Sequence, residues 1–269
     1  MNPILFQKTA GNGRSPAAGP CGFCRLRIAT VRDASWSALL SAQSFNFRNI
    51  LDVSYVGYSN DNYVFETENT LLYYWSDTII PLAKVRVTKT QYELRTLVQP
   101  GLVWIFMPGV YAEMVYGLST NEDGELGQDG YIELFHETDT TIASARLRGG
   151  YYHESEVVYF IPDVSLKKQF TPLYSLKAKY FFGYTDEPFY SHSLQLENGF
   201  TFYKNYSATV ITTGITEEIR DSWENSWSAG LRLEALSADR LTLKYLFQFH
   251  KRPFDIWGIE NGLTFDWEF

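Results

Sequence analysis

The fold class is decided by the last thirteen residues, Trp257-Gly-Ile-Glu-Asn-Gly-Leu-Thr-Phe-Asp-Trp-Glu-Phe269. Large apolar side chains occupy every second position of this segment, with Asn261 as the one exception in that series. Small or polar residues occupy the positions between them. A period of two indicates a β-strand with one apolar and one polar face, because successive side chains of a strand point in opposite directions.

The same alternation continues towards the N-terminus as far as Phe45. A charged, proline-containing turn, His250-Lys-Arg-Pro-Phe-Asp255, separates the last strand from the one before it. Repeating this reading predicts an all-β chain of about fourteen antiparallel strands, with twelve or ten as alternative counts. The expected strands cover about 50–58, 62–75, 79–89, 91–106, 110–119, 131–137, 141–152, 156–170, 173–184, 192–204, 206–217, 226–237, 241–249 and 257–269.

The composition excludes several protein classes. Aromatic residues make up 17% of the chain, yet the mean hydropathy is only -0.21. This combination is expected when each strand shows one face to lipid and the other to water. The net charge of -8 argues against a nucleic-acid partner, and two cysteines are too few for a disulfide scaffold.

A membrane-spanning helix is not expected. The longest uncharged stretch, 96–112, contains Pro100-Gly101 and Pro108-Gly109 and is shorter than the roughly 20 apolar residues that a spanning helix needs. If the chain enters a bilayer, it therefore does so as strands, and only a closed barrel satisfies strand backbones there.

Residues 1–44 differ from the rest of the chain. They are rich in glycine and proline, contain Cys21 and Cys24, and show no hydrophobic period. The segment 34–42 after three arginines is a short approximation of an export signal. We expect residues 1–44 to be an irregular leader or poor signal region, either cleaved or following a misassigned start, and residues 45–269 to form the barrel.

The C-terminal segment resembles the final strand of bacterial outer-membrane β-barrel proteins, which typically end in Phe with aromatic or aliphatic residues at alternate positions before it. Four residues match that pattern: Leu263, Phe265, Trp267 and Phe269. Asn261 departs from it. The resemblance is porin-like and points to no specific subfamily. It implies a location in the outer membrane of a Gram-negative-type envelope, contact with outer-membrane lipid, and recognition of these four residues by the barrel-assembly machinery.

A soluble β-sandwich or lipocalin-like barrel would also alternate. Two features favour the membrane barrel. Aromatic residues on the apolar face gather near strand ends, as membrane-interface girdles do. Charges gather on the polar face in mid-strand, as a wet lumen requires.

Sorting the charges by face predicts the residues that line the lumen. The basic ones are Lys84, Arg86, Arg95, Arg146, Arg148, Lys167, Lys177, Lys179, Arg232 and Lys244. The acidic ones are Asp52, Glu66, Glu68, Glu93, Glu113, Asp163, Glu197, Glu234 and Glu260. Because closure brings the first and last strands together, we expect acids to gather on one wall and bases to face them. The alternative is that the charges pair locally, for example Arg95 with Glu93 or Arg232 with Glu234.

These features favour a porin-like channel for passive diffusion of ions or small hydrophilic solutes. Eight strands leave an interior just filled by side chains, and 16–18 leave an aqueous channel, so fourteen fits a narrow pore. An occluded structural barrel, or an adhesin-like barrel acting through an acidic external loop at 119–130, is the alternative.

An enzyme is a weaker interpretation. His153-Glu-Ser155 has the His-x-Ser spacing found in outer-membrane lipid hydrolases, but Glu156 follows where Asn is usual. We therefore expect no catalytic residues. The scattered His136, His192 and His250 show no metal-ligand spacing, so no metal and no cofactor are expected.

Overall fold

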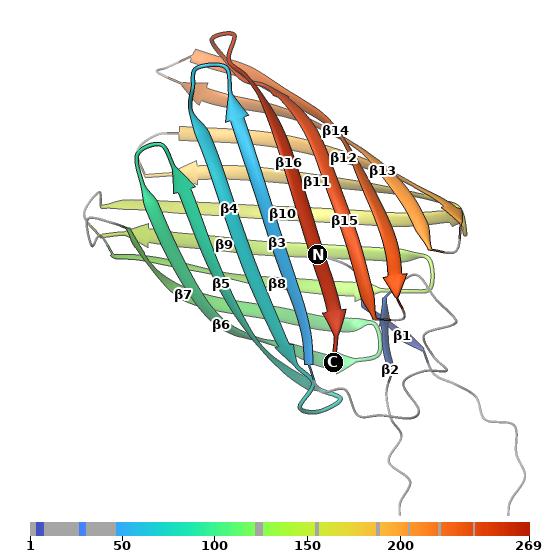
Figure 1. Cartoon of the computed structure of the whole chain (residues 1–269). Coiled ribbons are helices and arrows are strands. Elements are labelled where there is room, and N and C mark those ends of the chain that lie inside the picture. The colour runs from blue at the N-terminus through green and yellow to red at the C-terminus, as the bar shows by residue number, and fades with distance from the viewer. Residues whose placement is uncertain are drawn as a thin grey trace, which may run out of the picture.

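A closed barrel of fourteen antiparallel strands dominates the computed structural model (Figure 1). The structure describes residues 4–7, 27–30, 47–121, 126–153, 156–186, 189–203, 205–219, 222–238 and 240–269. The barrel strands are β3 (Phe47–Tyr58), β4 (Tyr63–Tyr73), β5 (Ile79–Thr90), β6 (Leu94–Met107), β7 (Val110–Asn121), β8 (Leu126–Glu137), β9 (Thr141–Tyr152), β10 (Val157–Thr171), β11 (Tyr174–Thr185), β12 (Phe189–Tyr203), β13 (Tyr206–Ile219), β14 (Ser222–Ala238), β15 (Leu241–Lys251) and β16 (Trp257–Glu268).

Two further strands lie in the region that the sequence predicts to be irregular. β1 (Ile4–Gln7) and β2 (Arg27–Thr30) pair antiparallel as a separate two-stranded sheet. The division of the chain at residue 44 stays a prediction. Among the described residues, no helix is long and apolar enough to cross a membrane.

The barrel closes between its first and last strands. β16 pairs antiparallel with β3 in a register that runs from Gly258 opposite Tyr58 to Glu268 opposite Arg48. Each remaining pair in the barrel joins strands that are consecutive in the chain. Every barrel strand therefore has two neighbours, and the barrel sheet has no open edge. The predicted closed barrel and its count of fourteen strands are confirmed.

We call the barrel end that holds Phe47 and Phe269 the terminal end, and the other the opposite end. The backbone N–H of Phe269 donates to the carbonyl oxygen of Phe47 at 2.9 Å, which ties the two chain segments together there. In Figure 1 the arrowhead of β16 lies beside the start of β3 at this end. At this end Gly109 makes the tight β6–β7 turn with a φ of 80°, a conformation that favours glycine.

The predicted acidic external loop at 119–130 is wrong, and a second predicted gap between strands, at 217–225, is also shorter than expected. β8 begins at Leu126 instead of residue 131, and β14 begins at Ser222 instead of residue 226, so the described residues of 119–130 and 217–225 lie in strands. Consecutive barrel strands are joined by connections of two to five residues at both ends. The glycine-rich, acidic composition of 119–130 imitates a loop. Its Asp129 in fact lies inside the barrel, where Arg148 on the next strand contacts it.

The outer face of the barrel is apolar. Large hydrophobic side chains at mid-strand are exposed on it, and Trp and Tyr are exposed near the strand ends: Val98, Ile132, Leu147, Val164, Leu194, Leu231, Tyr73, Trp104, Trp223 and Trp257. The barrel strands contain 11 to 17 residues, enough for the roughly 9–11 that a tilted strand needs to cross a bilayer. Contiguous exposed apolar surface of this extent is expected of a lipid-facing barrel.

Candidate functional site in the barrel interior

The barrel encloses a cavity of about 520 Å³ towards its terminal end. Of the nineteen charged residues that the sequence predicts to line the lumen, eleven line this cavity: Asp52, Glu68, Lys84, Glu113, Arg146, Lys167, Lys177, Lys179, Glu197, Arg232 and Lys244. The other eight lie outside its lining but hold positions of the same parity on the strands or in the adjoining turn: Glu66, Arg86, Glu93, Arg95, Arg148, Asp163, Glu234 and Glu260.

Positive charge is in excess on one side of the cavity. Six basic residues of the lining lie on strands β9 to β15, and we call them the basic arc: Arg146, Lys167, Lys177, Lys179, Arg232 and Lys244. Glu197 accepts hydrogen bonds there from two of them, Lys177 Nζ at 3.0 Å and Arg232 Nη2 at 2.9 Å. Two cations thus share one carboxylate.

Asp163 on β10 repeats this arrangement. Its Oδ2 accepts a hydrogen bond from Arg146 Nε at 2.6 Å, and Lys179 Nζ lies 3.2 Å from its Oδ1. The Asp163 side chain has no exposed surface. With two cations for each of two carboxylates, the basic arc keeps a net positive charge.

Two carboxylates of β4, Glu66 and Glu68, share one basic partner, Arg86 on β5. Arg86 donates to Glu68 Oε2 through Nη2 at 2.5 Å, and its Nε lies 3.7 Å from Glu66 Oε1. On β3, Asp52 accepts a hydrogen bond from the hydroxyl of Thr264 at 2.5 Å. One guanidinium therefore serves two carboxylates on this side of the barrel.

The expected separation of acids and bases onto opposite walls is only partial. Acidic residues lie beside members of the basic arc, as Glu197 does beside Lys177, and basic residues lie among the acids, as Arg86 does beside Glu68. Arg95 contacts Glu93, with Nη2 2.8 Å from Oε1. Arg232, however, hydrogen-bonds to Glu197 on β12, although Glu234 lies two residues away on its own strand.

A second polar network lies nearer the opposite end and centres on Asp129. Its carboxylate accepts hydrogen bonds from Gln99 Nε2 at 2.7 Å, from Arg148 Nη2 at 2.8 Å and from the hydroxyl of Tyr159. His250 and Glu260 also form a pair near this end, with Nε2 2.9 Å from Oε2. Sequence reasoning missed Asp129 because it assigned the residue to a loop.

Arg48 and Asp266 were also missed. They lie on the first and last barrel strands, and the guanidinium of Arg48 makes two hydrogen bonds to the carboxylate of Asp266. Asp266 has the polar parity of the C-terminal strand, so its inward orientation was visible in the sequence. Arg48 lies before residue 50, where the first strand is predicted to begin.

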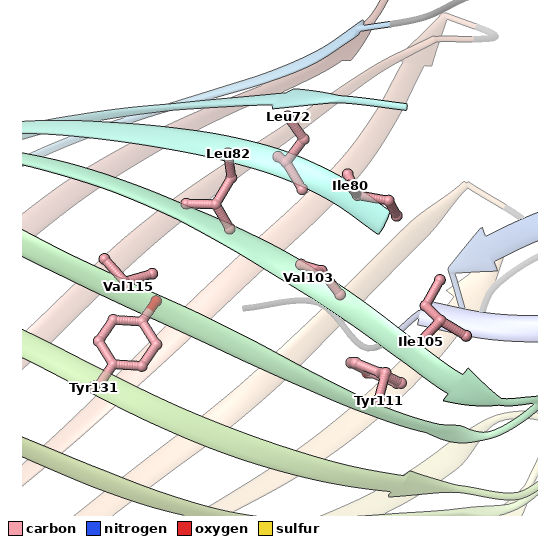
Figure 2. Packing of buried hydrophobic residues seen from close by; sticks show 8 residues of the cluster. All are labelled: Leu72, Ile80, Leu82, Val103, Ile105, Tyr111, Val115 and Tyr131. Atoms are coloured by element: carbon pink, nitrogen blue, oxygen red, sulfur yellow. The ribbon is translucent and has the colours of Figure 1, made fainter. Parts of the chain in front are cut away.

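An apolar wall inside the barrel is the largest departure from expectation. Eight inward-facing residues of β4 to β8 form a buried cluster, which we call the apolar arc: Leu72, Ile80, Leu82, Val103, Ile105, Tyr111, Val115 and Tyr131. Figure 2 shows their side chains side by side on these strands. Phe135 packs against the cluster, and its ring stacks on Tyr111 with 4.6 Å between centroids.

The sequence does carry a signal for this wall. In Leu102-Val-Trp-Ile-Phe106 both faces of the strand are apolar, and such continuous runs indicate a strand that is buried on both sides. The hydroxyl of Tyr131 marks the border of the apolar arc, since it receives a hydrogen bond from Lys84 and donates one to Glu113. The interior is therefore neither uniformly polar nor uniformly charged.

The other sequence-based candidates lie elsewhere. His153 is exposed at the opposite end, and Ser155, Cys21 and Cys24 lie outside the described residues. His136 and His192 lie on outward-facing positions of β8 and β12, whereas His250 faces inward. In the described part of the chain, no group of three His, Cys, Asp or Glu side chains is arranged to hold a metal ion.

Comparison with known proteins identifies solved structures that have a similar fold. No family model and no curated protein sequence matches the chain. Among solved structures, a "CymD monoaromatic hydrocarbon channel" superimposes with a TM-score of 0.66 at 6% identity, covering 86% of this chain and 90% of that one. A "Bacterial polysaccharide outer membrane secretin" gives 0.63 at 10% identity, covering 84% and 100%. The trimer form of OmpT, an outer membrane protein of Vibrio cholerae, gives 0.51 at 7% identity, covering 83% and 99%.

The fold is that of an outer-membrane β-barrel. In this barrel Leu263 of β16 and Phe269, the residue after this strand, are exposed, and the rings of Trp267 and Phe269 meet edge to face at 5.9 Å. Phe265 shares the outward parity of Leu263 and Trp267. Three residues of the predicted assembly signal thus lie on β16 at the barrel seam, and Phe269 directly follows that strand. Their recognition by assembly machinery stays a prediction.

Proposed function

We propose that this protein is an outer-membrane channel for passive diffusion of ions or small hydrophilic solutes. The observation that carries the proposal is the cavity of about 520 Å³ inside a closed ring of strands, whose lining includes eleven of the predicted charged side chains. The apolar outer face would contact outer-membrane lipid, and the C-terminal strand would be read by the barrel-assembly machinery. The proposed role is transport and not catalysis.

Charged residues in the lining support ion preference as well as permeation. Rings and walls of charge inside a pore set which ions enter, because the low-dielectric wall concentrates their field. The nineteen predicted residues would act through this field, with the excess charge of the basic arc favouring anions. The same ion pairs also favour the alternative of an occluded barrel, since pairing draws side chains across the lumen.

Planar lipid bilayers distinguish the two functions. Purified full-length protein, folded into detergent and checked for heat-dependent migration on gels, is added to a bilayer in KCl. Stepwise current increases are expected if the barrel is open. A silent bilayer with correctly folded protein would contradict the channel and support the occluded barrel.

A further inference from the structure

Two chemically different arcs face each other across the cavity. In the closed strand order, six strands separate β11 from β4 in either direction, so these two strands lie on opposite sides of the ring. β11 contributes Lys177 and Lys179 to the cavity lining, and β4 contributes Leu72 together with Glu68 and Thr70. The next pair of opposite strands, β12 and β5, contributes Glu197 to one side, and Leu82 and Lys84 to the other.

The basic arc contains an unfavourable juxtaposition. Lys167 on β10 and Lys177 on β11 are direct cross-strand partners, and both line the cavity. Like charges directly opposite each other destabilise a sheet. Glu197, which pairs with Lys177, and Asp163 each contact two cations, and Lys167 also interacts electrostatically with Glu137 on β8. An anion bound beside the two lysines would relieve this repulsion.

The apolar arc supplies the other half of a binding surface. Four of its members, Leu72, Leu82, Val103 and Tyr111, line the same cavity together with Phe135, which packs against the arc. The stacked pair of Tyr111 and Phe135 places an aromatic surface there. Sites for small organic ligands combine apolar walls with a few placed polar groups in volumes of about 300–1,000 Å³, a range that includes this cavity.

From this pairing of arcs we propose that the cavity binds and passes small amphipathic organic anions, with aromatic carboxylates as the best-fitting class. The carboxylate lies against Lys167 and Lys177, and the ring lies against the apolar arc. An inorganic anion uses only the first surface, and a neutral aromatic compound uses only the second. The inference rests on the proposed channel function and names its substrate class.

The test compares three probes at neutral pH: benzoate, acetate and benzyl alcohol. Each is added to full-length protein conducting KCl in a planar bilayer, and the concentration that halves the single-channel current is measured. Benzoate is expected to act at roughly tenfold lower concentration than either other probe, a ratio that corresponds to about 1.4 kcal/mol. Equal potency of the three probes would overturn the inference while leaving the channel intact.

Paired variants locate the two surfaces. Lys167→Gln and Lys177→Gln should each weaken block by benzoate and by acetate, and Glu197 keeps Arg232 as a partner in the second variant. Lys168→Gln is the matched control, because Lys168 is the next residue of β10 but is exposed on the outer face. A loss of block in the control equal to that in Lys167→Gln would contradict the assignment.

Val103→Thr tests the apolar arc with almost no change in volume. It should weaken block by benzoate and leave block by acetate unchanged, whereas Val98→Thr on the outer face of the same strand should change neither. Calorimetric titration of benzoate and acetate into folded protein in detergent separates binding from conduction. Preferential benzoate binding without any current would refute the channel but support the ligand class. Current without preferential benzoate binding would support the channel but refute the ligand class.

Discussion

Arg48 and Asp266 join the first and last strands of the barrel by a two-point contact. Arg48 Nε donates to Asp266 Oδ1 at 2.9 Å, and Arg48 Nη2 donates to Oδ2 at 2.7 Å. Both side chains are less than a tenth exposed. The contact spans 218 residues of sequence, so it forms only when the barrel closes.

Removing one partner of this pair should weaken barrel closure. Asp266→Ala leaves the guanidinium of Arg48 buried without its carboxylate, and losing one member of a buried ion pair costs about 3–5 kcal/mol. Urea unfolding in lipid vesicles, followed by tryptophan fluorescence, measures the loss. Asp255→Ala removes an exposed pair with Lys251 and should change stability little. Equal effects of the two substitutions would show that the seam contact is not special.

Close packing between β6 and β7 should make Gly101 intolerant of a side chain. A Cβ atom at residue 101 would lie 2.4 Å from the carbonyl oxygen of Met114 and 2.9 Å from Val115 Cγ2. Gly101→Ala is therefore expected to destabilise the barrel by about 1–3 kcal/mol, as overpacking does. Gly214→Ala is the control, because nothing lies within 4 Å of its added Cβ. The same unfolding assay tests whether only the first substitution lowers stability.

A charge on the outer face should reveal the depth of lipid contact. Leu194 is half exposed near the middle of β12, and Leu194→Arg should cost about 2–4 kcal/mol if that position faces the bilayer midplane. Tyr203→Arg, at the end of the same strand, should cost about 0–1 kcal/mol because it reaches the interface. An equal loss of stability for the two substitutions would contradict membrane embedding.

Neutralising inward-facing arginines should move ion preference towards cations. In Arg146→Gln and Arg148→Gln, the carboxylates of Asp163 and Asp129 each lose one cationic neighbour, so the local field becomes more negative. Reversal potentials measured under a KCl gradient should shift in the cation-selective direction. Lys168→Gln changes the same charge on the outer face and should leave the reversal potential in place.

Much of the barrel architecture could be predicted from the local alternation of apolar and polar residues. Alternation alone predicted the last strand and the count of fourteen, because period two reports which face of a strand is apolar. It failed at Asp129, where glycine and acidic residues imitate a loop until Arg148 is brought beside them. It also failed at Val103 and Ile105, whose apolar side chains point inward although one face of each strand was expected to be polar.

By itself, the sequence determined which residues share a face of each strand, since that depends only on position along an extended chain. Tertiary structure alone decided which residues meet. Arg232 contacts Glu197 on β12, Arg48 contacts Asp266 across the seam, and lysines on β11 face leucines on β4 and β5. The physical reason is that strand register and ring closure act over long separations in the chain, whereas alternation is fixed between neighbouring residues.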